Sequence, residues 1–427
     1  MTVHRNTRKF AAHRVAVGVL AAALVVTAAG CSSDGGEDAE TQGASGALAG
    51  SDLAAEEGST EVPGPSPRLA AVDAAGRVVI LDLETGDELT DFGGAQDARI
   101  SAVDDRFAFL TAFDGDTTIV DVGSWSTDHG DHAHSYVKTP TELGEIEDAQ
   151  GAHVVANDGK VAVFSPRGGA ASVLSLPELR KGKVDVVGMI NADASGVVIP
   201  MADHFVTSRD TETSSTFELR DSTSAVVHEF TDACPNFEGQ AVFRTSIVAA
   251  CDDGFVVLSY INAESSSRKI AYPEGVASGA RPTTLRTTAG SSLVVGNGGK
   301  EVLVFDSALS STVDGAEVPW TQIPTQGQVL DAALSGNGKQ VLALLADGSL
   351  AVFDAQTGEQ VASGQVLSSP FDTSAGAEAA PSFVVGANRA YVTEPAVGAV
   401  HEVDYLDNGR VARTFDVAAT SLMVAGF

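Results

Sequence analysis

The segment from Asp128 to His134 carries the side chains of this chain whose types and spacing best suit metal binding. The whole sequence has nine histidines, and three of them lie within this segment. Two aspartates interleave with them. Imidazole and carboxylate groups are ligands for zinc and similar divalent ions, and a zinc site needs about four of them. The candidate metal ligands are His129, His132, His134, Asp128 and Asp131.

The local spacing would let these side chains converge without help from distant residues. In an extended segment His132 and His134 point to the same side, and Gly130 permits a bend that returns His129 to them. A solvated polar loop that is rich in histidine but binds no metal is the alternative. The ligand types suit zinc, and they also suit copper(II), which binds such ligands more tightly, or nickel(II).

The first 30 residues have the composition of an export signal. Basic residues at positions 5, 8, 9 and 14 precede an apolar run from Val15 to Ala28, which is short for a membrane span. The run leads into Ala28-Ala29-Gly30-Cys31, which resembles a bacterial lipobox. We therefore predict a signal peptide at residues 1–30, a lipid on Cys31 and an extracytoplasmic protein anchored to the cell membrane. A secreted or periplasmic protein with an ordinary cleaved signal, or an uncleaved anchor, is the alternative.

Export also bears on the remaining cysteines. If Cys31 carries lipid, Cys234 and Cys251 remain as a pair in a compartment that permits disulfides. They flank a predicted hairpin, and a disulfide that closes a loop of this size would stabilise the fold by about 3 kcal/mol in the chain-entropy model. Two buried free thiols are the alternative. Metal ligation is less favoured, because neither cysteine has a cysteine or histidine close by in sequence.

The formal net charge of −31 limits the partners of the chain. Removal of residues 1–30 takes away four basic residues and no acid, so −31 becomes −35. A chain this acidic repels nucleic acid and anionic lipid surfaces. We therefore expect no nucleic-acid partner and contact with the membrane only through the N-terminal lipid.

Residues 31–67 are rich in glycine, serine, alanine and acid, and contain no lysine or arginine. Such a segment cannot bury enough apolar surface to fold. We predict a disordered tether over residues 31–67, stiffened at its end by the prolines of residues 63–67.

Residues 68–427 predict an all-β domain. Short β-branched runs alternate with turn pairs such as Asp158-Gly159 and Asn408-Gly409, which are hairpin signals. Similar strands that end in aspartate or serine recur about 40 to 55 residues apart, as at 77–82 and 349–354. This period fits the four-stranded blades of a β-propeller. We predict eight blades, or seven if the unit at residues 193–230 is irregular.

Two consequences follow from the repeating period. A pair of β-sandwiches is the alternative architecture, and a single sustained period argues against it. The candidate metal segment comes directly after the strands of the second unit, which end at residues 118–125. We therefore expect it on an exposed connection, where binding residues are commonly found.

The sequence resembles the AztD-type zinc metallochaperones, which are extracytoplasmic β-propellers encoded with zinc ABC importers. The resemblance spans roughly residues 68 to 425. Four segments carry it in order: Gly123 to Tyr136, Ala152-His153-Val154-Val155, the Cys234-Pro235 and Ala249 to Gly254 pair, and the last blade with Tyr391 to Pro395 and Val400 to Asp404.

The resemblance implies that the histidine loop binds zinc as cargo and that the two cysteines are paired. It implies delivery of zinc to the solute-binding protein of a zinc ABC importer. It also adds His153 as a candidate ligand, for which a structural histidine in a strand is the alternative.

The propeller body departs from the family pattern. Where the family carries further histidines and a glutamate, this chain has Asn157, Ala194-Ser195-Gly196, Glu238 and Gln240. The resemblance therefore carries over the role of the loop and not a second metal site in the body.

Common enzyme signatures are absent from the sequence. It has no His-Glu-x-x-His motif, no Gly-x-Ser-x-Gly elbow and no Walker loop. We expect a monomeric binding protein and not an enzyme. The alternative function is a cell-surface propeller interaction module, with the histidine loop a vestige or a low-affinity metal buffer.

Overall fold

The computed structural model describes residues 56–130, 132–193, 196–211, 213–276, 281–308, 320–375 and 380–427. All of them belong to one unit of the chain, Asp52–Phe427. The predicted signal peptide and Cys31 lie outside the described residues. Within the described part, no helix has the length and apolar character needed to cross a membrane.

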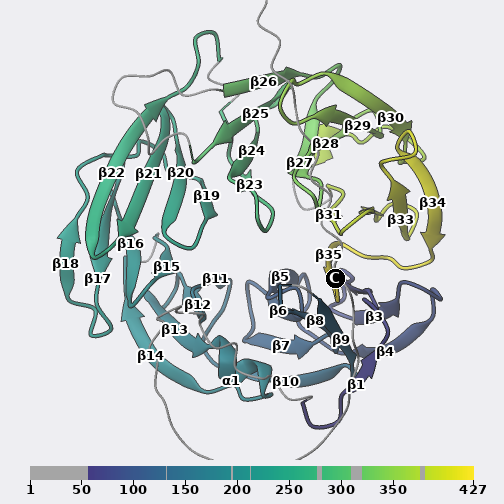
Figure 1. The fold of residues 1–427 in the computed structure, drawn as a ribbon, viewed down its shortest axis with the longest axis horizontal. Coiled ribbons are helices and arrows are strands. Elements are labelled where there is room, and N and C mark those ends of the chain that lie inside the picture. Colours follow the sequence, from purple (N-terminus) through teal and green to yellow (C-terminus); the bar gives the residue numbers. More distant parts are fainter. Residues whose placement is uncertain are drawn as a thin grey trace, which may run out of the picture. The chain divides into compact units, whose positions relative to one another are not determined.

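Eight four-stranded antiparallel sheets make up most of the described part of this unit. They follow one another around a common centre, as the blades of a β-propeller (Figure 1). The all-β propeller prediction is confirmed, and the described residues form eight blades. The first four blades, each given from its innermost strand outward, are β35 (Ser421–Ala425), β2 (Arg68–Val72), β3 (Val78–Asp82), β4 (Glu88–Phe92); β5 (Arg99–Val103), β6 (Phe107–Thr111), β7 (Thr117–Asp121), β10 (Thr141–Ile146); β11 (His153–Asn157), β12 (Lys160–Ser165), β13 (Ala170–Ser175), β14 (Val186–Asn191); and β15 (Val198–Met201), β16 (His204–Asp210), β17 (Ser215–Arg220), β18 (Val226–Glu229).

The last four blades repeat the same antiparallel order. They are β19 (Gly239–Val242), β20 (Ser246–Cys251), β21 (Gly254–Ile261), β22 (Glu264–Ala271); β23 (Leu285–Arg286), β24 (Leu293–Asn297), β25 (Glu301–Asp306), β26 (Trp320–Pro324); β27 (Val329–Leu334), β28 (Gln340–Leu345), β29 (Ser349–Asp354), β30 (Gln360–Gln365); and β31 (Phe383–Val385), β32 (Ala390–Glu394), β33 (Ala399–Asp404), β34 (Arg410–Phe415).

The first blade contains strands from both ends of the domain. Strand β35 pairs with β2 in the register Arg68↔Ala425 to Val72↔Ser421. This pairing joins the C-terminal strand to the first blade and closes the ring.

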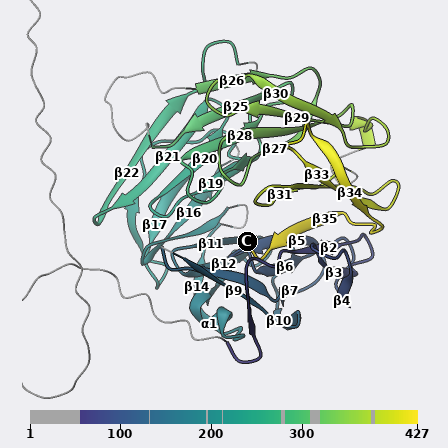
Figure 2. The same cartoon turned by 45° about the vertical axis from the view of Figure 1, so that its right-hand side comes forward.

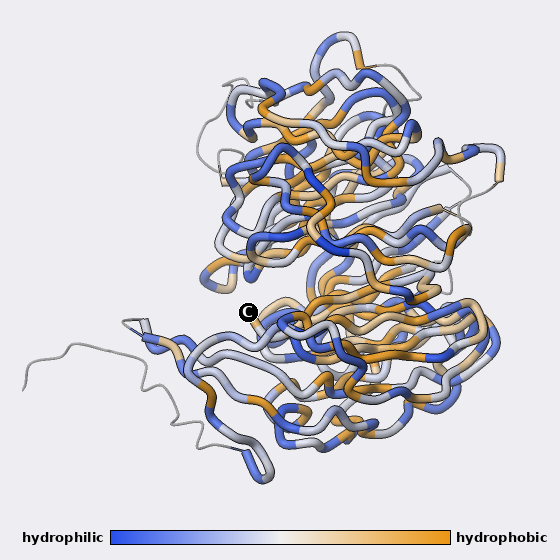
Figure 3. Tube along the Cα trace, turned by 90° about the vertical axis from the view of Figure 1, so that its right-hand side faces the viewer, coloured by the Kyte–Doolittle hydropathy of each residue, from blue (hydrophilic) through white to orange (hydrophobic). Residues whose placement is uncertain are grey.

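Burial of the strands follows their position in each blade. The middle strand β3 is buried on both faces because blades pack against each other, whereas the outer strand β34 alternates exposed and covered residues. The core lies between neighbouring blades: Phe107 and Ile119 of the second blade pack with Val161 and Val163 of the third. Figure 3 shows hydrophobic segments running through the body of the domain and hydrophilic segments at many of the outer loops.

The predicted turn pairs form tight hairpins. Asp158 and Gly159 have φ values of 45° and 76° and join β11 to β12, where Asn157 pairs with Lys160. Two consecutive left-handed residues match the twist of the flanking strands. The helices of the described part are short, α1 (Leu176–Arg180), which Ser175 caps, and the 3-10 helix η3 (Thr373–Ala375).

One further sheet lies outside the blades. It has three strands in the order β1 (Thr60–Val62), β9 (Ala133–Val137), β8 (Ser124–Asp128). Strands β8 and β9 form a hairpin inserted between the third and fourth strands of the second blade. We expected the candidate metal segment after that unit, and it lies instead inside the blade's own strand order.

Strand β1 changes the predicted end of the tether. Residues 56–67, which composition assigned to a disordered segment, include β1, paired with β9 in the register Thr60↔Val137 to Val62↔Ser135. Ser66 also accepts a hydrogen bond from Ser124 Oγ through its carbonyl, at 2.5 Å. The folded part therefore begins before residue 68, because the inserted hairpin offers an edge on which the acidic segment pairs.

Candidate metal centre

The candidate metal segment forms the tip of the β8–β9 hairpin. Asp128 pairs with Ala133, the last pair before the turn, and the His129 N–H donates to the carbonyl of His132 at 2.8 Å. Gly130 has a φ of 89°, a conformation that favours glycine. The Asp128 carboxylate accepts from the Gly130 N–H at 2.7 Å and so stabilises the turn.

The turn brings the three predicted histidines together. The ring centroids of His129 and His132 are 5.3 Å apart, those of His129 and His134 are 5.2 Å apart, and those of His132 and His134 are 4.9 Å apart. The Nε2 atoms of His132 and His134 are 3.0 Å apart. His129 and His132 are exposed and His134 is half-buried. A solvent ion or a partner protein can therefore reach all three rings.

A glutamate that we did not predict contacts this cluster. Glu61 Oε1 lies 2.7 Å from His134 Nδ1. The contact arises because β1 pairs with β9, with Glu61 opposite Tyr136. In sequence Glu61 is one of many acids in the segment before residue 68, and only the neighbouring Thr60 and Val62 hint at a strand.

In this structure the histidine cluster does not have the arrangement of a metal site. Among the described residues, no group of three or more His, Cys, Asp or Glu side chains has the arrangement that would hold a metal ion. His132 and His134 instead hydrogen-bond to each other. Two ligands of a tetrahedral zinc, each about 2.0–2.1 Å from the metal, are about 3.3 Å apart. The two nitrogens would therefore need only a small separation to share a metal ion.

A buried charge network supports the base of the hairpin. Arg106 forms ion pairs with Asp121 at 2.7 Å and with Glu56 at 2.6 Å, and Lys138 lies 2.7 Å from Asp121. The Arg106 guanidinium also lies 3.7 Å from the Trp125 ring, which stacks on Tyr136. The network thus joins the second blade, the N-terminal segment and the hairpin.

The network holds Asp121 and Arg106 in their charged forms. Burial would raise the pKa of Asp121, but the hydrogen bonds and charges of Arg106 and Lys138 lower it below its usual value. Burial would lower the pKa of Arg106, but the hydrogen bonds that its guanidinium donates to Glu56 and Asp121 raise the pKa overall. Arg68 joins the first blade to the base of the hairpin, because its Nη1 donates hydrogen bonds to the carbonyls of Val122 and Lys138.

Of the other predicted site residues, His153 lies apart from the cluster. Asp131 is outside the described residues. His153 lies on β11, the innermost strand of the third blade. Asn157, where the family carries histidine, donates its Nδ2 hydrogens to the carbonyls of Pro200 and Phe243 at 2.9 and 3.1 Å. Asn157 therefore has a structural role between blades.

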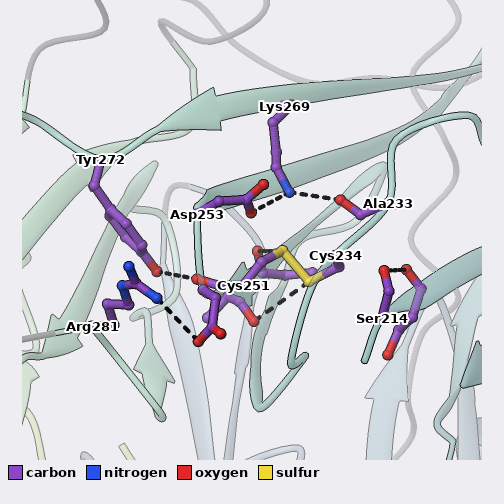
Figure 4. The surroundings of a disulfide bond; sticks show 12 residues. Ser214, Ala233, Cys234, Cys251, Asp253, Lys269, Tyr272 and Arg281 are labelled. Atoms are coloured by element: carbon purple, nitrogen blue, oxygen red, sulfur yellow. Dashed lines mark hydrogen bonds and ion pairs between the residues drawn. A yellow bond between two sulfur atoms is a disulfide. The ribbon is translucent and has the colours of Figure 1, made fainter. Parts of the chain in front are cut away.

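The predicted disulfide between Cys234 and Cys251 is confirmed. It joins the segment before the fifth blade to the end of β20, and Figure 4 shows its surroundings. Tyr272 donates its hydroxyl hydrogen to the carbonyl of Cys251 at 2.8 Å. The bond stabilises the fold and lies on other blades than the histidine hairpin.

Comparison with known proteins shows the fold. No protein-family model matches the chain. The crystal structure of AztD from Citrobacter koseri is similar with a TM-score of 0.75 and 21% identity, covering 85% of this chain and 98% of that chain. The chain has the fold of AztD. Apo AztD from Citrobacter koseri gives a TM-score of 0.74 at the same identity and coverage.

The chain is also similar in fold to a dehydrogenase. Dihydro-heme d1 dehydrogenase NirN in complex with DHE has a TM-score of 0.54 and 12% identity, covering 86% of this chain and 80% of that chain. A propeller ring therefore serves more than one chemistry, and the function must be argued from the site.

Proposed function

We propose that this protein binds zinc outside the cytoplasm through the histidine hairpin and passes it to the solute-binding protein of a zinc ABC importer. The observation that carries the proposal is the mutual approach of three imidazoles at one exposed turn. The resemblance of this loop to that of the zinc metallochaperones, and the AztD fold, support zinc as the cargo. The lipid on Cys31 would keep the protein at the membrane that holds the importer.

His129, His132 and His134 are the proposed ligands, with Asp128, Asp131 or water as the fourth. Each histidine binds metal through a nitrogen lone pair, so His132 and His134 must exchange their mutual hydrogen bond for bonds to zinc. Glu61 is a positioning residue. By accepting the Nδ1 hydrogen of His134 it leaves the Nε2 lone pair of that ring for the metal.

An exposed, incompletely organised site suits a carrier. Zinc binding must order the turn and break a hydrogen bond, and both costs reduce the affinity relative to a rigid closed site. A receiving site with a more fixed geometry would then take the ion. The exposed tip allows that partner to approach the ligands directly.

The alternative is an interaction module on the cell surface with a loop that buffers metal weakly. The observation in its favour is that no described group of side chains already forms a metal site. Transfer distinguishes the two. The protein is loaded with one zinc equivalent and mixed with the apo solute-binding protein, once directly and once across a dialysis membrane. Faster transfer on direct mixing supports delivery, and equal rates contradict it.

A further inference from the structure

A cavity of about 590 Å³ lies on the innermost strands of the propeller. It is lined by residues of β5, β11, β19 and β35, from four different blades, and by none of the histidine hairpin. These strands surround the centre of the ring in both Figure 1 and Figure 2. In the described sheets each of them has one backbone edge without a strand partner, which faces this region.

Three polar side chains on this cavity have no hydrogen bond or ion pair with any described residue. They are Arg99 of β5, His153 of β11 and Gln240 of β19. They come from three blades. Arg99 and His153 are 54 residues apart along the chain, and His153 and Gln240 are 87 residues apart. Arg99 and His153 are exposed and Gln240 is partly buried, so all three side chains can reach a ligand in the cavity.

Arg99 is unusual for this chain. The sequence has 57 acidic and 26 basic residues, so carboxylate partners are abundant. Within the described part of the chain, every other arginine makes a hydrogen bond, an ion pair or another contact. The one guanidinium left without such a partner is the one on the central cavity.

Several side chains of the lining can donate hydrogen bonds. A guanidinium binds a carboxylate through two parallel N–H bonds, and the Gln240 amide donates two hydrogens. His153 is exposed, but the protein around its ring partly desolvates it and lowers its pKa. The ring is therefore neutral at pH 7 and has one N–H to donate. Ser421 accepts from the Ile100 N–H at 3.1 Å, which leaves its own hydroxyl hydrogen free to donate.

The same lining disfavours a metal ion at His153. The charge of Arg99 repels a cation, and no group of metal-binding side chains occurs there among the described residues. Asp97 also lines the cavity and forms no ion pair with a described residue. Its negative charge partly offsets the attraction of Arg99 for an anion.

From this arrangement we infer that the central cavity binds a small organic carboxylate, held by Arg99 together with Gln240 and His153. This inference does not depend on the proposed zinc function. It concerns another region of the propeller and another class of ligand.

Calorimetric titration of the mature protein tests the inference. Metal is removed on a chelating resin, so that no soluble chelator remains to compete. Sodium succinate, sodium L-glutamate and sodium phosphate are titrated separately at equal ionic strength. We expect saturable binding of succinate or glutamate at one molecule per chain. Binding of phosphate alone, or of none of the three, overturns the inference.

Arg99→Gln should weaken carboxylate binding at least ten-fold, as expected for loss of a charge-assisted hydrogen bond. Arg244→Gln is the matched control, because Arg244 is 81% exposed and its removal changes the net charge equally. Equal weakening by both variants, or none by Arg99→Gln, contradicts the inference. Gln240→Ala gives a second test that leaves the charge unchanged, and it should weaken binding as well.

A variant with His129, His132 and His134 replaced by alanine should bind the carboxylate normally. Loss of zinc binding with normal carboxylate binding would separate the two proposals. Circular dichroism and the melting temperature confirm that each variant is folded.

Discussion

Glu61 Oε1 and His134 Nδ1 lie 2.7 Å apart, although the two residues are 73 positions apart in sequence. The contact exists because the segment before the propeller adds strand β1 to the inserted hairpin. A carboxylate that orients one nitrogen of a histidine fixes which other nitrogen faces a metal. The N-terminal segment thereby becomes part of the candidate zinc site.

Replacement of Glu61 tests this relationship. Glu61→Ala should weaken zinc binding about ten-fold without changing the number of zinc ions bound, because positioning partners of metal ligands typically contribute that much. Competition with a chromophoric chelator measures the affinity. Glu57→Ala is the control, since Glu57 is an exposed acid four residues earlier. Equal affinities for the Glu61 variant and the wild type would remove Glu61 from the site.

The charge network below the hairpin should matter strongly for stability. Asp121 is fully buried between Arg106 and Lys138. Asp121→Ala leaves the buried Arg106 and the partly buried Lys138 without their shared carboxylate. We expect a loss of about 3–5 kcal/mol in the free energy of unfolding, measured by urea denaturation. Asp114→Ala breaks the exposed pair with Arg167 and should cost less than about 1 kcal/mol. Similar losses for the two variants would show that the network adds no special stability.

The disulfide should act on stability and not on metal binding. It closes a loop with a sequence separation of 17 residues. The double variant Cys234→Ser, Cys251→Ser should lose about 3 kcal/mol in the chain-entropy model. Zinc stoichiometry should stay the same, and a reductant should destabilise the wild type but not the variant. A change in zinc stoichiometry on removal of the cysteines would count against the assignment of the site to the hairpin.

His153 gives a prediction about pH. His153 is exposed, but the protein around its imidazole partly desolvates it and lowers its pKa below the ordinary value of about 6.5. The unfolded chain therefore binds a proton more readily than the folded chain. The contribution of His153 to stability is present above about pH 6.5 and is lost as the pH falls through its lower folded value. Between pH 7 and pH 5 the melting temperature should fall more steeply for the wild type than for His153→Gln. Parallel curves for the two proteins would contradict the lowered pKa.

Local signals in the sequence predicted much of the fold. The turn at Asp158-Gly159 and the repeated strand endings depend on neighbouring residues, so the blade period could be read directly. The approach of the three histidines was also predictable, because a single glycine turn joins them. The disulfide could be proposed because two cysteines remained for pairing once a lipid was assigned to Cys31.

Features that depend on long-range pairing could not be predicted. Strand β1 is short and lies in an acidic segment, and its only stabilising surface is the edge of a hairpin more than 70 residues away. Composition therefore assigned it to a tether, and Glu61 was missed. The lack of a described partner for the Arg99 guanidinium could likewise not be predicted, because the cavity it lines is formed by strands from four blades.

Zinc titration of the hairpin variant tests the central claim most directly. The wild type and a variant with His129, His132 and His134 changed to alanine are stripped of metal and titrated with zinc in the presence of a competing chelator. The proposed function predicts that the variant loses at least one tightly bound zinc equivalent while its melting temperature without metal stays the same. Unchanged stoichiometry and affinity in the folded variant would contradict it.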